Sequence, residues 1–265
     1  MGDLVRRDDQ GSVAVLTLND PARLNALSDA MLAALRDRLA ALATDSAIRV
    51  VILRATGKAF CAGHDLREMQ ASRAAPDGGG VAFADLFARC AEVMQMIPAL
   101  PQPVIAQVHG IATAAGCQLV ASCDLAVAAT GTRFGVNGIN IGLFCSTPMV
   151  ALTRAIPRKA AFEMLATGDF IDATRARELG LINRVTDPAT LEPETLALAQ
   201  QLAAKLGPAL HIGKRAFYDQ AGLNLAQAYA HAGQAMVTNM LLRDTDEGIA
   251  AFIDKRRPDW AEGSD

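Results

Sequence analysis

Two clusters of small residues are the features whose types and spacing could do chemistry. One spans residues 110–116 and reads GIATAAG, and the other spans residues 60–66 and reads FCAGHDL. Each follows an apolar run that is typical of a buried strand and precedes a helical pattern. A strand that passes through Gly and Ala into a helix leaves backbone N–H groups free at the helix start. Two such junctions could hold one developing oxyanion between them, although small residues at these turns also serve packing.

The elements around these clusters alternate between strands and helices. Ser28 is expected to cap a helix whose buried face carries leucines at 32, 35, 39 and 42. Gly168 and Gly180 are expected to end two helices, and Asp187-Pro188 to open a third. The sequence therefore predicts an α/β fold with a C-terminal helical unit. Strands are expected at 12–18, 49–54, 104–108, 124–129 and 181–185, and helices from 28, at 82–97, 159–167 and 173–179, and over most of 195–257.

Two long stretches of the chain, residues 93–123 and 134–153, contain no charged residue. A membrane span is excluded by the prolines, glutamines and histidine of the first stretch and by the asparagines and glycines of the second. A buried strand followed by a buried helix accounts for the apolar residues themselves. It does not account for the small-residue cluster at 110–116.

Composition excludes several classes of protein. The chain has 265 residues, a net charge of −3 and 5% aromatic residues, so no nucleic-acid partner is expected. Five cysteines without C-x-x-C spacing favour reduced thiols over disulfides, and no metal site is predicted. The N-terminus lacks an apolar segment of the kind that directs secretion. These features predict a cytoplasmic protein.

Several segments together resemble the crotonase, or enoyl-CoA hydratase/isomerase, superfamily. They cover almost the whole chain in the family's order: LNDPARLNALS (18–28), VVILRATGKAFCAGHDLREM (50–69), PVIAQVHGIATAAGCQLVASCDLAVA (103–128), FGVNGINIGL (134–143), ATGDFIDATRARELGLINRV (166–185) and AFIDKRRPDW (251–260). The resemblance implies a spiral of ββα turns over 1–195 and a helical region over 196–265 that packs into homotrimers or hexamers. It implies an acyl-CoA thioester as ligand, with coenzyme A as part of the substrate and no further cofactor.

The resemblance also implies which backbone groups polarise the thioester carbonyl. They are the amide N–H of His64, which follows Ala62-Gly63, and the amide N–H of Ala115, which precedes Gly116. Many members carry Gly at the position of Ala115, and Ala retains the N–H donor.

The predicted substrate-binding set surrounds these two amides. Arg23 and Leu24 match the stretch that borders the adenine and pantetheine of coenzyme A, and Asn140 could bind a water or a substrate carbonyl. Lys58, Lys255 and Arg256 are candidates for the phosphates, the last two from a neighbouring subunit; ordinary solvated surface charge is the alternative. The remaining members of the set are Ala62, Asp65, Leu66, Ile111 and Asn137.

The chain departs from the family at both acid–base positions. Hydratases of this family use two glutamates, and here the matching positions are Gln118 and Gly138. An amide cannot take a proton at neutral pH, and one lost acid–base group typically removes roughly 10²–10⁴ in rate. The two losses need not multiply, because such groups act as a unit. Efficient hydration by the usual mechanism is therefore not expected.

Two other residues could replace the missing carboxylates. The ring of His64 could transfer protons, paired with Glu68 one helical turn later, but the favoured interpretation is that the ring points elsewhere. Cys145 is expected to be a buried thiol, since no basic neighbour would activate it. G-H-D-L together with N-x-G-L-F-C-S-T-P is similar to a divergent subgroup, the enoyl-CoA hydratase domain-containing proteins, which lack both glutamates.

Three hypotheses about function remain open. The protein is a nominal enoyl-CoA hydratase, a lyase of fatty acid metabolism, with atypical or weak chemistry; or it is a non-catalytic acyl-CoA-binding or assembly protein; or it is a thioester hydrolase or isomerase with another proton-transfer group. The non-catalytic hypothesis expects hydration to appear when glutamates are restored at 118 and 138. All three require the amides of His64 and Ala115 to face one cavity.

Overall fold

The computed structural model describes residues 2–260 and contains a six-stranded sheet with the order β1-β2-β3-β4-β6-β9. The β1–β2 pair is antiparallel and the other neighbours are parallel. Three short strands, β5, β7 and β8, form a second sheet. The strands are β1 Val5–Gln10, β2 Val13–Leu18, β3 Val50–Ala55, β4 Val104–Val108, β5 Ile111–Thr113, β6 Leu125–Ala129, β7 Arg133–Gly135, β8 Ile171–Asp172 and β9 Arg184–Thr186.

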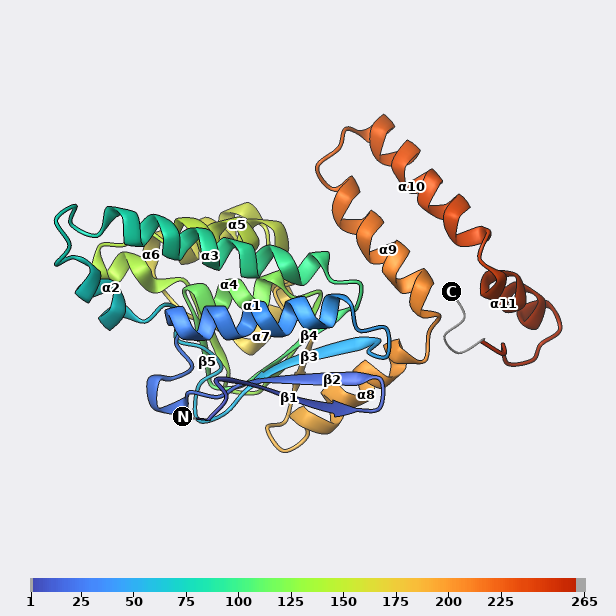
Figure 1. Ribbon diagram of the computed structural model, residues 1–265, viewed down its shortest axis with the longest axis horizontal. Helices are drawn as coiled ribbons and strands as arrows, with labels where there is room; N and C mark the ends of the chain where they lie inside the picture. Colours follow the sequence, from blue (N-terminus) through green and yellow to red (C-terminus); the bar gives the residue numbers. More distant parts are fainter. Residues whose placement is uncertain (1, 261–265) are drawn as a thin grey trace.

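Helices cover both faces of the large sheet (Figure 1). The main core lies between the sheet and α1, α3 and α4, and α8 packs on the other face against alternate residues of β2 and β3, such as Val13 and Ile52. The helices are α1 Asp29–Ala43, α2 Leu66–Ser72, α3 Gly80–Ala99, α4 Ala115–Ser122, α5 Ser146–Ala155, α6 Arg158–Thr167, α7 Ala173–Leu179, α8 Leu191–Ala203, α9 Gly207–Gln220, α10 Leu225–Met240 and α11 Arg243–Ile253, with 3-10 turns η1 Pro21–Arg23 and η2 Asn137–Ile141.

The predicted α/β class with C-terminal helices is confirmed, and so are several of its local details. The Ser28 hydroxyl accepts a hydrogen bond from the Met31 amide at the start of α1. The predicted leucines form the buried face of that helix. Gly168 and Gly180 are the left-handed C-caps of α6 and α7.

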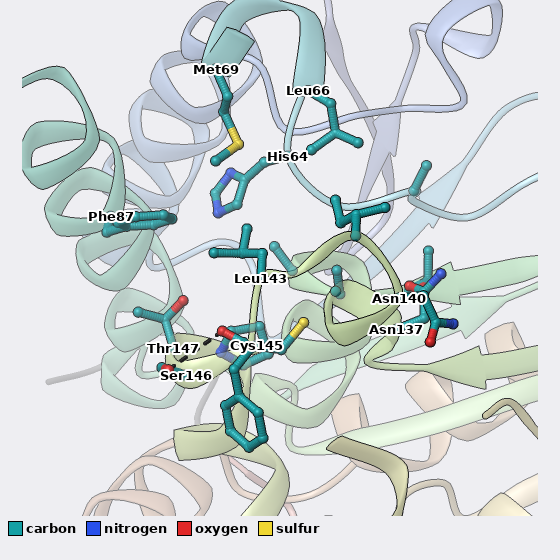
Figure 2. A pocket seen from close by; sticks show the side chains of 18 residues that line it. His64, Leu66, Met69, Phe87, Asn137, Asn140, Leu143, Cys145, Ser146 and Thr147 are labelled. Atoms are coloured by element: carbon teal, nitrogen blue, oxygen red, sulfur yellow. Dashed lines mark hydrogen bonds between the residues drawn. The ribbon is translucent and has the colours of Figure 1, made fainter. Parts of the chain in front are cut away.

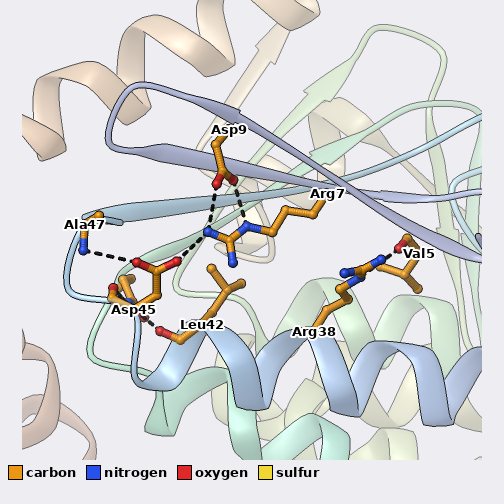
Figure 3. Close-up of polar contacts among 8 residues, drawn as sticks. Val5, Arg7, Asp9, Arg38, Leu42, Asp45 and Ala47 are labelled. Atoms are coloured by element: carbon orange, nitrogen blue, oxygen red, sulfur yellow. Dashed lines mark hydrogen bonds and ion pairs between the residues drawn. The ribbon is translucent and has the colours of Figure 1, made fainter.

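Strand β1 was not predicted, because its sequence VRRDDQ is charged. It is an edge strand, held partly by its own charges (Figure 3). The Arg7 guanidinium donates to Asp9 at 2.8 Å and to Asp45, in the turn after α1, at 2.6 Å. Arg7 accordingly holds the pKa of the Asp45 carboxyl below its ordinary value. Charged residues on an edge strand also discourage pairing with another chain.

Three elements differ clearly from their predicted bounds. Helix α3 continues through Pro98 to Ala99. Pro188 does not begin a helix, because the Asp187 carboxylate accepts from the Ala189 amide in a turn and α8 starts only at Leu191. The last strand of the large sheet begins at Arg184 rather than at residue 181.

The C-terminal helices α9, α10 and α11 extend from the core at the end opposite α2 (Figure 1). A buried cluster ties α9 to the core: the Lys214 ammonium lies 2.7 Å from the Asp124 carboxylate, to which the Tyr218 hydroxyl also donates. Helix α8 runs across the predicted division between residues 195 and 196, and that division remains a prediction. Within residues 2–260, no helix is both long and apolar enough to cross a membrane.

Candidate active site

The two small-residue junctions lie side by side. Cys61 and Ala112 form a parallel bridge, in which the Thr113 amide donates to the Cys61 carbonyl at 3.0 Å. This approach depends on glycine: a β-carbon on Gly116 would overlap the Cys61 carbonyl oxygen, and one on Gly63 would lie 2.9 Å from the Ala114 β-carbon. The glycines therefore bring the two backbone segments into contact.

A strained residue immediately precedes the second junction's helix. Ala114 has φ 50° and ψ −120°, a region that residues with a side chain rarely adopt. Its amide donates to the Gly135 carbonyl at 2.9 Å, so β7 fixes this conformation. Such strain costs of order 1–3 kcal/mol and concentrates at functional sites. Here it sets the direction of the next amide, that of Ala115.

The amides of His64 and Ala115 are both free. Neither donates a hydrogen bond to any residue that the structure describes. Both residues line the same cavity, as all three functional hypotheses require. Two unpaired amides on one wall form an arrangement that can accept a carbonyl oxygen with developing negative charge.

The cavity has a volume of about 320 Å³ and lies between α2, α3, η2 and the start of α5 (Figure 2). Its walls are mostly apolar, with a few polar groups among them, which is typical of a small-molecule site. The apolar side chains include Leu66, Met69, Phe87, Ile141, Leu143 and Phe144, and the polar ones are His64, Thr113, Asn137, Asn140, Ser146 and Thr147.

The imidazole of His64 points into the cavity, contrary to the interpretation favoured from the sequence (Figure 2). It packs edge-on to Phe87, with 5.7 Å between the ring centroids. Both ring nitrogens are buried, and neither has a partner within the described residues. Glu68 does not pair with it, since that carboxylate accepts from the Asp29 amide at 2.9 Å. Burial lowers the pKa of His64 from its ordinary value.

Gln118 is not among the residues that line the cavity. It lies one turn further along α4 than Ala115, is buried, and its Oε1 has no partner in the part of the chain that the structure describes. At this position the side chain is behind the cavity wall rather than on it.

Gly138 lines the cavity but leaves no room for a side chain. A β-carbon there would overlap the Leu143 carbonyl oxygen and lie 2.8 Å from the Cys145 sulfur. A glutamate at 138 fits only if residues 143–145 move, and the expectation that restored glutamates would restore hydration stays a prediction. Cys145 is a buried thiol, as expected, and burial raises its pKa.

The two asparagines of the predicted substrate-binding set also line the cavity. Asn137 Oδ1 accepts from the Thr113 hydroxyl at 2.6 Å, which links η2 to β5. Asn140 Nδ2 lies 3.5 Å from the Gly168 carbonyl oxygen at the end of α6. Each therefore has an internal contact that holds η2 against its neighbours.

Some of the other members of that set line the cavity, and the rest hold the backbone around it in place. Ala62 and Leu66 line the cavity. The carboxylate of Asp65 instead caps α2 by accepting from the Arg67 amide at 2.9 Å, and it lies 3.4 Å from Arg23. Leu24 and Ile111 contribute backbone carbonyls. The Leu24 carbonyl accepts a hydrogen bond from the Ala62 amide, and the Ile111 carbonyl accepts one from the Cys61 amide, each at 3.1 Å.

The candidate phosphate ligands lie outside the cavity wall of a single chain. Lys58 is exposed at the end of the β3 loop. Lys255 and Arg256 follow α11, at the far end of the molecule from α2 (Figure 1), and Arg256 pairs with Glu247 at 2.6 and 2.9 Å. A role for these two residues requires a neighbouring subunit and remains a prediction.

Most of the large apolar residues that line the cavity were not predicted from the sequence. The loop at 71–80 contributes no lining residue, whereas Met69 before it and Phe87 after it do. Their only indication in the sequence is an apolar residue on a helical face, which looks the same in any core. Ser146 and Thr147 join the cavity because α5 begins there.

The fold and the paired junctions define a crotonase-type α/β protein, and comparisons agree. The family model for enoyl-CoA hydratase/isomerase matches residues 8–263, so the chain belongs to this family. It is similar to "Enoyl-CoA hydratase domain-containing protein 3, mitochondrial" of Danio rerio, with 43% identity over 262 residues, or 99% of this chain and 89% of that protein.

Two crystal structures are also close. An enoyl-CoA hydratase of Mycobacterium smegmatis is 54% identical and superposes with a TM-score of 0.93, covering 97% of this chain and 98% of that one. Human enoyl-CoA hydratase domain-containing protein 3 is 44% identical with a TM-score of 0.92, covering 97% of this chain and all of that one (100%).

The expectation of a cytoplasmic protein is contradicted by these relatives. The curated relatives from Danio rerio, rat and human are all named as mitochondrial proteins. Unpaired cysteines indicate a reducing environment, and they do not distinguish one reducing compartment from another.

Proposed function

We propose that this family member binds an acyl-CoA thioester whose carbonyl oxygen accepts hydrogen bonds from the amides of His64 and Ala115. One observation carries the proposal: both amides are free of partners among the described residues, and both residues line one cavity. The contact of Gly63 and Gly116 with the opposite junction holds the amides in place before a ligand arrives. Preorganised donors of this kind cost no rearrangement when charge develops on the oxygen.

The apolar walls suit an aliphatic acyl chain. Met69, Phe87 and Leu143 surround the space beyond the two amides. Burying methylene groups against such side chains contributes roughly 0.8 kcal/mol each. The coenzyme A moiety is assigned to Arg23 and Lys58 of the same chain and to Lys255 and Arg256 of a neighbouring subunit.

The activity is that of a nominal enoyl-CoA hydratase whose hydration is weak. Gln118 stands where one family carboxylate would be, and Gly138 leaves no space for the other. A non-catalytic acyl-CoA-binding role is the second candidate, favoured by the same lack of carboxylates. A thioester hydrolase or isomerase that uses another proton-transfer group is the third.

Self-assembly into a trimer or hexamer is part of the proposal. The segment from α9 to α11 exposes large apolar side chains that a single chain leaves uncovered, among them Leu225, Leu241 and Phe252, which are 75%, 81% and 84% exposed. Exposed apolar surface of this extent is typical of a protein interface.

Titration calorimetry tests the proposed ligand. Hexanoyl-CoA should bind more tightly than free coenzyme A, because only the thioester offers a carbonyl to the amides and a chain to the apolar wall. Equal affinities for the two compounds, or no binding of either, would contradict the proposal. Turnover of crotonyl-CoA then separates a weak hydratase from a non-catalytic binder.

A further inference from the structure

Very few groups in the cavity can carry a proton. Within the described part of the chain, its lining residues include no Asp, Glu, Lys, Arg or Tyr, and only His64 and Cys145 titrate. The carboxylates nearest in sequence to His64 are engaged elsewhere. Asp65 caps α2, and Glu68 accepts from the Asp29 amide and lies 3.7 Å from Arg23. Neither is available to assist a reaction in the cavity.

Cys145 is unsuited to proton transfer at neutral pH. Its thiol is buried, and burial raises its pKa further above neutrality. The thiolate, which is the reactive form of cysteine, is therefore scarce there. Its sulfur packs where a side chain at position 138 would stand, which is a packing role.

The ring of His64, unlike the thiol of Cys145, is suited to proton transfer. Its two nitrogens are buried without partners among the described residues, an arrangement that typically costs about 1–3 kcal/mol for an unsatisfied polar group. Native proteins rarely leave such groups unpaired without a functional reason. The ring lies near the Leu27 backbone and the Asp29 carboxylate and packs on the edge of Phe87, and the exposed Leu143 side chain lines the same cavity.

The amide and the imidazole of His64 would act in the same reaction step, the amide on the thioester oxygen and the imidazole on the neighbouring carbon. If the amide holds the thioester oxygen, the acyl carbons of the ligand occupy the same cavity as the imidazole of that residue. A neutral imidazole offers one nitrogen that accepts a proton and one that donates. No other residue is needed for a reaction that removes a proton and returns it.

We propose that His64 is the single acid–base group of this site, and that the site catalyses proton transfer at the α-carbon of an acyl-CoA. The imidazole nitrogen takes the α-proton, the C–H electron pair forms the C=C bond of an enolate, and the carbonyl pair moves to the oxygen held by the two amides. The imidazolium then returns a proton to the α-carbon. With a 3-enoyl-CoA it returns the proton to the γ-carbon instead and yields the 2-enoyl isomer. No water, oxidant or second base is consumed.

The test is exchange of the α-protons of hexanoyl-CoA in D₂O, followed by mass spectrometry. His64→Gln keeps the amide donor but cannot take a proton, so exchange should fall about 100-fold or more, the typical contribution of a general base. Binding of hexanoyl-CoA should be retained. His211→Gln is the matched control, because that histidine is exposed on α9, and it should exchange like the wild type. Added imidazole should partly restore exchange to His64→Ala.

The inference rests on the proposed ligand, and calorimetry separates the two failures. If hexanoyl-CoA does not bind the wild type, the proposed function fails and this inference fails with it. If hexanoyl-CoA binds but the wild type does not exchange, or His64→Gln exchanges at the wild-type rate, only the role of His64 is overturned. A melting curve for each variant shows whether it is folded.

Discussion

On one side of the cavity, residues 60–66 and 110–116 present backbone donors held by a strand bridge and two close glycine contacts. On the other side, residues 137–148 present asparagines, a buried thiol and large apolar side chains. The first side retains what polarising a carbonyl requires. The second side has no group able to activate water. If the two amides bind a thioester carbonyl as proposed, carbonyl binding and water activation are separable properties of this fold.

The side that holds the donors should tolerate no added side chain. Gly116→Val should destabilise the protein by about 3 kcal/mol or more, at the upper end of overpacking costs, because its β-carbon overlaps the Cys61 carbonyl. Hexanoyl-CoA affinity should fall with it, since the amides separate. Denaturant unfolding and calorimetry measure the two effects.

Gly213→Val is the matched control. Gly213 lies within α9, where a β-carbon would meet nothing within 4 Å, so its replacement should cost well under 1 kcal/mol. Equal losses in the two variants would show that the close contact of the junctions is not what matters.

The opposite side should resist restoration of a carboxylate. Gly138→Glu should cost about 1–3 kcal/mol, because Leu143 and Cys145 must move, and should add no crotonyl-CoA hydration. Gly222→Glu, which places the same side chain in open space, serves as the control. A stable Gly138→Glu protein with a measurable gain in hydration would contradict the packing described for residues 143–145.

The smallest expected effect concerns pH. Burial lowers the pKa of His64 in the folded protein, so the unfolded chain binds the proton more readily. The histidine's contribution to stability is therefore present above its unfolded pKa and is lost as pH falls through the folded pKa. His64→Gln should lose less stability than the wild type between pH 7 and pH 5, as measured by urea unfolding. Identical pH profiles would show that the ring is solvated.

The parts of this structure that local sequence determines could be predicted. Ser28 and the leucines after it specify α1, and the small residues around Gly63 and Gly116 indicate the two junctions. Strand β1 could not be recognised, because Arg7 is held by partners that include Asp45, distant in sequence. The direction of the His64 ring and the exclusion of a side chain at 138 likewise depend on contacts with Phe87 and Leu143, which no local pattern encodes.

The central claim is that two backbone amides polarise a thioester carbonyl, and infrared spectroscopy of hexanoyl-CoA with a ¹³C-labelled carbonyl tests it most directly. Bound to the protein, the labelled C=O stretch should shift to a lower frequency than in water, because preorganised donors at His64 and Ala115 weaken the bond. A bound ligand whose carbonyl absorbs at the same or a higher frequency than in water would contradict the account.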